Sequence, residues 1–191
     1  KHRANLIDKS LERLERIIFW ITLIFYGCSM KKLLLLRHAK SSWKDKGVSD
    51  HHRPLNKRGK RDAPRMGWLL QKEELVPDII LSSTAVRARD TAVRLAKSCY
   101  YKGQINYGDS LYLGGAEAYL DALRSLRNEF KIVLVVGHNP DIEVLVMILT
   151  EQAERIPTAA LARIDLPIED WSTLSSESKG RLVRVWRPKE L

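Results

Sequence analysis

Two histidines and two arginines in this chain follow directly on short apolar segments. The first segment ends in Arg37 and His38, the second is followed within a few residues by Arg87, and the third by His138. Arginine is almost never buried without a partner, so packing alone does not explain this pattern. Guanidinium groups match phosphate oxygens in pairs and neutralise the charge that develops in phosphoryl transfer. The four side chains therefore predict a site for a tetrahedral dianion.

A histidine in such a site can be the nucleophile, because neutral imidazole attacks phosphorus and water then breaks the resulting phosphoramidate. His38 is the candidate for this role, and nearby guanidinium charge would help keep it neutral. We expect a backbone carbonyl to hold its other ring nitrogen and fix the tautomer. Alternatives remain for the single residues: His38 as a solvated strand end, His138 as a helix-start residue, and Arg87 paired with Asp90 on its own helix.

The three apolar segments predict buried strands near residues 33–36, 79–81 and 132–136. Helices are expected after the cap residue Asn56 to about residue 74, around residues 88–96, over 116–127 and over 141–150, with later strands at 159–166 and 181–186 and a short one near residue 105. This alternation predicts an α/β fold, a three-layer sandwich whose mostly parallel sheet carries helices on both faces. Function gathers at the carboxyl ends of such strands, which would bring the four side chains to one edge.

Composition limits the class of protein. A chain of 191 residues with 45% hydrophobic content can form one sizeable core, and a formal net charge of +10 favours anionic partners. Cys28 and Cys99 have no metal-ligand or redox spacing, so we expect no disulfide framework and no metal site, and a cytoplasmic location suits the chain. Adjacent His51 and His52 resemble a metal pair only superficially, and we expect a solvated loop there.

Residues 1–29 differ from the rest. They combine a charged stretch with an apolar run over residues 17–26, which is too short to cross a bilayer unaided. We interpret them as an extension dispensable for the chemistry, followed by one domain over residues 30–191. The alternatives are an exported or lipid-modified chain, or an amphipathic helix that brings the protein to a membrane surface.

Four motifs occur in a fixed order along the chain: Arg37-His38-Ala39, Arg53-Pro54-Leu55-Asn56, the segment from Ser83 to Thr91, and Gly137-His138-Asn139-Pro140. Together they resemble the histidine phosphatase superfamily, which has the phosphoglycerate mutase-like fold, and especially its small SixA-type phosphohistidine phosphatases. Ala39 stands where many members carry glycine, a variant associated with the SixA-like branch.

The resemblance implies that His38 becomes transiently phosphorylated while Arg37, Arg87 and His138 hold the phosphoryl group. Arg53 would be a further phosphate or substrate contact, although its loop position also suits a residue without a role. Many larger relatives have an acidic proton donor, and Glu117 lies in roughly the corresponding region. A solvent-facing residue in the first turn of a helix is the stronger interpretation of Glu117.

We therefore expect a metal-independent phosphatase without a cofactor that acts on protein phosphohistidine. The alternatives are a small-molecule phosphomonoesterase of the same family and a regulatory protein that binds phosphate without turnover. Nucleic acid is not an expected partner, because the basic residues do not form a stripe interleaved with aromatic side chains. We expect a monomer.

Overall fold

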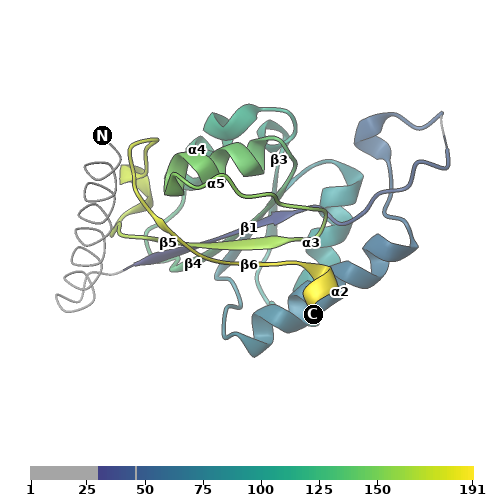
Figure 1. The fold of residues 1–191 in the computed structure, drawn as a ribbon, viewed down its shortest axis with the longest axis horizontal. Coiled ribbons are helices and arrows are strands. Elements are labelled where there is room, and N and C mark those ends of the chain that lie inside the picture. Colours follow the sequence, from purple (N-terminus) through teal and green to yellow (C-terminus); the bar gives the residue numbers. More distant parts are fainter. Residues whose placement is uncertain (1–29, 46) are drawn as a thin grey trace, which may run out of the picture.

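The computed structural model describes residues 30–45 and 47–191, which form a single sheet with helices on both sides (Figure 1). The strands are β1 (Lys31–Arg37), β2 (Ile79–Ser83), β3 (Ile105–Gly108), β4 (Ile132–Gly137), β5 (Leu161–Leu166) and β6 (Arg181–Trp186). The helices are α2 (Lys57–Lys72), α3 (Val86–Ser98), α4 (Gly115–Arg124) and α5 (Asp141–Thr150), with short 3₁₀ helices η1 (Asp50–His52), η2 (Asp109–Leu111), η3 (Trp171–Thr173) and η4 (Pro188–Glu190).

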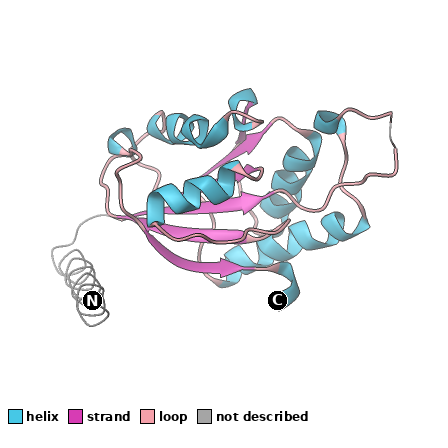
Figure 2. Ribbon diagram, turned by 45° about the horizontal axis from the view of Figure 1, so that its top comes forward, coloured by secondary structure: helices cyan, strands magenta, loops and turns pink. Residues whose placement is uncertain are grey.

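The six-stranded sheet has the order β3-β2-β4-β1-β5-β6. Strands β3, β2, β4 and β1 run parallel to one another, whereas β5 is antiparallel to both β1 and β6 (Figure 2). The prediction of a mostly parallel sheet is confirmed. The short strand near residue 105 is also present, as β3 on the edge.

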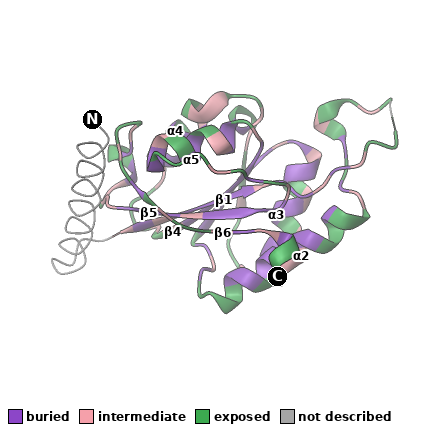
Figure 3. Ribbon diagram, in the orientation of Figure 1, coloured by how far each residue is buried: buried purple, intermediate pink, exposed green. Residues whose placement is uncertain are grey.

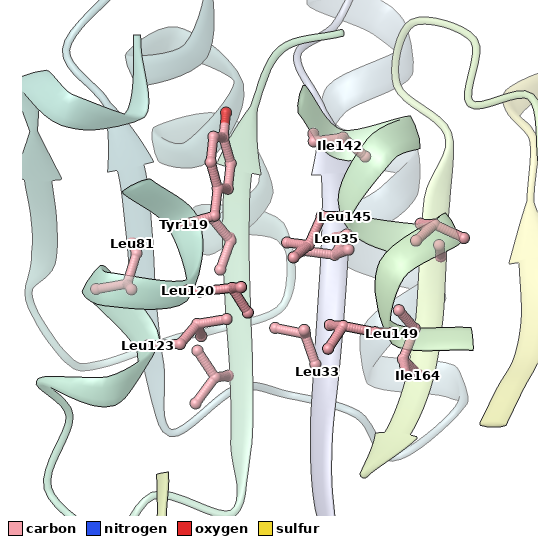
Figure 4. Packing of buried hydrophobic residues seen from close by; sticks show 14 of the residues in the cluster. Leu33, Leu35, Leu81, Tyr119, Leu120, Leu123, Ile142, Leu145, Leu149 and Ile164 are labelled. Carbon is pink, nitrogen blue, oxygen red and sulfur yellow. The ribbon is translucent and has the colours of Figure 1, made fainter. Parts of the chain in front are cut away.

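Alternate residues of β1 pack on opposite faces of the sheet. Leu33 and Leu35 join the core beneath α4 and α5, and Leu34 and Leu36 join the core beneath α2 and α3 (Figures 1 and 4). All four are fully buried, and burial follows the central strands and the inner faces of the helices (Figure 3). A strand buried on both faces has to be apolar throughout, which explains the unbroken leucine run and confirms the three layers.

Two local features fix the start of α2. The Asn56 side chain caps the helix by accepting a hydrogen bond from the Gly59 backbone N–H at 2.9 Å, as predicted. A Cβ at Gly59 would lie 2.3 Å from the backbone oxygen of Lys40, so only glycine allows the helix to approach the segment after β1. Helix α2 is thereby held beside the end of β1.

Helix α4 is shorter than predicted, because it ends at Arg124 instead of Arg127. The Leu126 N–H donates to the Leu123 oxygen, so the chain tightens into a 3₁₀-type turn and leaves the α-helix there.

The predictions made for residues 1–29 lie outside the described residues and stay predictions. Within residues 30–45 and 47–191, no helix is long and apolar enough to cross a membrane.

Candidate active site

The carboxyl ends of β1 and β4 position the two histidines. The strands are paired in parallel, with Arg37 opposite Gly137, and the His38 N–H donates to the Gly137 oxygen at 2.9 Å. The rings of His38 and His138 consequently lie 5.0 Å apart between centroids. Strand β2 neighbours β4, and α3 begins just after it, which brings Arg87 to the same edge. The predicted convergence of these side chains is confirmed.

His38 is held as a neutral imidazole of one tautomer. Its Nδ1 lies 2.8 Å from the Ala39 carbonyl oxygen, which can only accept, so Nδ1 carries the proton. Its Nε2 accepts a hydrogen bond from Arg87 Nε at 3.2 Å, so Nε2 carries no proton and its lone pair points at the Arg87 guanidinium in the pocket wall. Burial, together with His138, Arg87 and Arg37, lowers the pKa of His38 to about 3, although the bond to Ala39 opposes this shift. The imidazole is therefore unprotonated at Nε2 at neutral pH.

His138 is a second buried, neutral imidazole. Its Nδ1 accepts from Arg87 Nη2 at 3.3 Å, so the proton lies on Nε2, which is 2.9 Å from Ser83 Oγ at the end of β2. The His138 backbone N–H also donates to the buried Tyr119 hydroxyl at 3.1 Å, which ties the site to the core (Figure 4). Burial and, after it, the charge of Arg87 lower the pKa of His138 to about 4, although the charge of Asp50 opposes this shift.

Arg87 pairs with Asp50, not with Asp90 on its own helix. Arg87 Nη2 lies 2.8 Å from Asp50 Oδ2, and Nη1 donates to the Asp50 backbone oxygen at 2.5 Å. Since Arg87 Nε binds His38, one guanidinium links the nucleophile candidate to η1. The alternative interpretation, in which Arg87 only pairs with an acidic residue of its own helix, is therefore wrong.

Asp50 is a site residue that the sequence analysis did not identify. Its carboxylate accepts from Arg53 Nη1 at 2.7 Å and from the Tyr112 hydroxyl at 2.9 Å, in addition to Arg87. Burial alone would raise the pKa of Asp50, but the hydrogen bond from Tyr112 and the charges of Arg87 and Arg53 outweigh it and lower the pKa. Asp50 is therefore an ionised carboxylate that aligns two guanidiniums.

Arg53 lines the pocket, but its guanidinium is largely engaged by the protein. Apart from Asp50, it binds the Ser42 carbonyl oxygen through Nε at 3.1 Å and Ser41 Oγ through Nη2 at 2.7 Å. The Trp43 ring covers it, with 3.2 Å between the guanidinium carbon and the ring centroid. Arg53 is thus a fixed charge in the pocket wall and not a loop residue without a role.

Arg37 lies at the rim. Its Nη1 donates to the Ile156 oxygen at 2.9 Å, whereas its buried Nε has no hydrogen-bond partner among the described residues. Burial lowers the pKa of Arg37, and the charge of Glu143 opposes this shift.

These side chains enclose a pocket of about 280 Å³, large enough for a phosphoryl group and part of its carrier. The residues that line it are Arg37, His38, Lys40, Ser41, Trp43, Asp50, Arg53, Arg87, Leu113, His138, Asn139 and Thr158. In the described part of the chain, no group of three or more histidine, cysteine, aspartate or glutamate side chains is placed to hold a metal ion.

Glu117 lies in the first turn of α4 and does not line the pocket, as the stronger, solvent-facing interpretation predicts, so the structure gives the proton-donor alternative no support. Its side chain is 65% exposed and pairs with Arg124 at 2.5 Å on the outer surface of α4. His51 differs from expectation: it is half-buried, its Nε2 lies 3.1 Å from Thr84 Oγ1, and its ring packs edge-on against Tyr112. His52 is exposed, as a solvated loop predicts.

The residues that the sequence analysis missed had weak signals. Asp50 precedes Arg53 by three residues, which is an ordinary ion-pair spacing in any helical turn. Tyr112 lies just after η2 in a connection between β3 and α4 and has no pattern around it.

Comparisons with known proteins agree with this geometry. The sequence profile of the histidine phosphatase superfamily (branch 1) matches residues 33–107. An uncharacterised protein of Mycobacterium tuberculosis is 32% identical over 138 residues, covering 66% of this chain and 84% of the relative. Two solved SixA-type structures superpose over 83% of this chain. The structure from Agrobacterium tumefaciens is 30% identical in sequence, superposes with a TM-score of 0.71, and has 98% of its chain covered. The structure from Nakamurella multipartitia is 26% identical in sequence, superposes with a TM-score of 0.74, and has 96% of its chain covered. The chain belongs to the histidine phosphatase superfamily and has the fold of its SixA-type members.

Proposed function

We propose that this protein removes phosphoryl groups from phosphohistidine in proteins by transferring them first to His38. Membership of the superfamily supports a phosphatase. The observation that carries the finer proposal is the environment of His38: one ring nitrogen is fixed by a carbonyl, and the other is unprotonated and held by Arg87, one of the guanidinium groups that line the pocket.

In the first step, the Arg87 Nε–H turns from His38 Nε2 to a phosphoryl oxygen, the freed Nε2 lone pair attacks phosphorus, and a new N–P bond forms. The P–N bond to the substrate imidazole breaks, and the leaving nitrogen keeps that electron pair and takes a proton from solvent. In the second step, water attacks the phosphoryl group on His38, inorganic phosphate leaves, and the neutral imidazole is restored. Atoms and charge balance without a cofactor or a metal ion.

The cationic side chains would stabilise the charge on the phosphoryl oxygens in both steps. Arg87 contacts both imidazoles and lies at the centre of the arrangement. Arg37 has a buried Nε for which a phosphoryl oxygen would be an acceptor. Arg53 contributes charge from the pocket wall, and His138 can donate through Nε2 if it turns from Ser83 to a phosphoryl oxygen.

The pocket lacks a protonated carboxyl group among the described residues that line it, and this favours a substrate whose leaving group is a nitrogen. Among the described residues that line it, Asp50 is the one with a carboxyl group, and its lowered pKa keeps it ionised at neutral pH. A substrate with an alkoxide leaving group needs an acid to protonate it, whereas the imidazole of phosphohistidine leaves with less help. The small-molecule phosphomonoesterase therefore ranks second.

The test is phosphate release by the full chain from a phosphohistidine protein and from an aryl phosphate, with EDTA present. We expect turnover that survives chelation, favours the phosphohistidine protein, and falls at least about 10³-fold in His38→Ala. His52→Ala is the matched control, because His52 is exposed and does not line the pocket. If wild type and His38→Ala are equally inert while inorganic phosphate still binds, the protein is a phosphate-binding regulator instead.

A further inference from the structure

A cavity of about 700 Å³ lies beside the active site, between α2 and the chain that follows β6. Arg58, Arg61 and Arg65 line it from α2, and Arg187 and Lys189 line it from the opposite side. Figure 1 shows the C-terminal end of the chain beside α2. The mechanism above uses none of these five cationic side chains.

The cavity adjoins the phosphoryl pocket, because Thr158 lines both. A third cavity of about 350 Å³ lies next to each of them: it shares Pro157 and Arg187 with the large cavity and Arg37 with the phosphoryl pocket. We call the large and the third cavity together the basic groove. A chain whose phosphorylated side chain reaches His38 would have its neighbouring residues in this groove.

The basic groove carries excess positive charge. The three guanidiniums of α2 share one buried carboxylate, Asp62, at 2.8 Å from Arg61, 3.8 Å from Arg58 and 4.0 Å from Arg65. The Arg61 side chain is 65% exposed. One carboxylate cannot neutralise three cations, so the helix presents charge to whatever enters the groove.

The opposite wall is better balanced, since Arg187 binds Glu154 and lies 3.7 Å from Glu190. Over the whole basic groove, seven cationic side chains face three carboxylates. The cationic residues are Arg37, Arg58, Arg61, Arg65, Arg155, Arg187 and Lys189, and the carboxylates are Asp62, Glu143 and Glu190.

We propose that the basic groove binds an acidic segment of the substrate protein and thereby selects phosphohistidines flanked by aspartate or glutamate. The inference rests on the proposed function and adds a substrate preference to it. Charge complementarity over a groove beside the reacting pocket is the reason, because such a groove steers and retains an anionic chain. Nucleic acid fits less well, since none of the described residues that line the basic groove has an aromatic ring on which a base could stack.

The test uses two peptides with the same central phosphohistidine, one flanked by glutamates and the other by glutamines. Their binding to full-length His38→Ala protein is measured by fluorescence anisotropy, which needs no turnover. We expect the acidic peptide to bind about 10-fold more tightly at low salt, with a preference that shrinks as salt rises. Arg61→Gln/Lys189→Gln, in the same background, should bring the two peptides within about two-fold of each other.

The matched control removes two charges elsewhere. Arg127 and Lys179 are exposed, pair with Glu129 and Glu151, and do not line the basic groove, so Arg127→Gln/Lys179→Gln should keep the preference. Equal binding of the two peptides to the parent protein would overturn the proposal. Loss of the preference for the acidic peptide in the control variant would also overturn it. A third contradicting result would be an oligothymidylate of equal charge that competes for the basic groove as well as the acidic peptide does.

Turnover of the same peptides by the protein with His38 intact separates the two proposals. Selective binding without His38-dependent turnover would refute the proposed function and leave the groove's selectivity standing. Turnover of both peptides at equal efficiency and affinity would refute the groove alone.

Discussion

Acidification from pH 8 to pH 5 should destabilise this fold through two residues of its active site. Burial lowers the pKa of His38 to about 3 and that of His138 to about 4, whereas a histidine in the unfolded chain has a pKa near 6.5. Below pH 6.5 the unfolded state therefore binds protons that the folded state does not. The free energy of unfolding is highest above pH 6.5 and falls as the pH drops toward the folded-state pKa values.

The magnitude follows from the unfolded-state pKa. At pH 5, about 1.5 units below that value, each histidine that stays neutral in the folded state lowers the free energy of unfolding by about 2 kcal/mol. The two residues together account for about 4 kcal/mol. This is a large part of the free energy of unfolding of a folded domain, which is typically about 5–15 kcal/mol. Carboxylates add little in this range, because pH 5 is still about one unit above the ordinary pKa of aspartate.

The assay is urea unfolding of the full chain at pH 8, 6.5 and 5. The wild type should lose about 4 kcal/mol between the two extremes, His38→Asn about half of that, and the double variant His38→Asn/His138→Asn almost none. His52→Asn, which alters an exposed residue, should behave as the wild type. A wild-type stability that does not change from pH 8 to pH 5 would mean that the two imidazoles titrate alike in the folded and unfolded chains, and the lowered pKa values of His38 and His138 would be refuted.

Three further substitutions have defined outcomes. Arg87→Lys keeps a positive charge but loses the planar guanidinium that contacts both histidines. In the phosphate-release assay, kcat/KM should therefore fall by ~10²-fold or more, and a fall of less than about three-fold would contradict the central role of Arg87 in phosphoryl binding. Glu117→Gln should leave kcat and its pH profile unchanged, because the carboxylate is exposed and bound to Arg124; a large loss of kcat would restore it as a proton donor. Gly59→Ala should lower the free energy of unfolding, measured by urea denaturation, by about 1–3 kcal/mol, because the Cβ of the alanine would lie 2.3 Å from the Lys40 backbone oxygen. An unchanged free energy of unfolding would show that α2 can move away from this oxygen.

The parts of the site that could be predicted from the sequence are those attached to regular elements. His38 and His138 follow strands that are buried on both faces, and continuous apolar runs reveal such strands. Once the strands are parallel neighbours, their carboxyl ends share an edge, so the positions of the two imidazoles follow from the fold class. The capping role of Asn56 was predictable for a similar reason, because it depends on residues a few positions away.

The parts that could not be predicted depend on loops and on contacts between distant segments. Asp50 reaches Arg87 and Tyr112, which are 37 and 62 residues away, and the conformation that brings it there is a single 3₁₀ turn. The exposed position of Glu117 was predicted only as the stronger of two interpretations, since a one-residue shift at the start of a helix turns a side chain by about 100°. Periodicity carries no information on either point.

The same charges serve two requirements of a histidine nucleophile in this site. Burial makes the largest contribution to keeping His38 neutral, and the guanidiniums of Arg87 and Arg37 add to it while attracting the phosphoryl dianion. Asp50 offsets part of that charge and in return orients Arg87, whose Nε binds the attacking nitrogen. The affinity for phosphate and the pKa of His38 therefore cannot be changed independently at Arg87 and Arg37. A substitution that removes the Arg87 guanidinium should weaken phosphate binding and at the same time raise the pKa of His38.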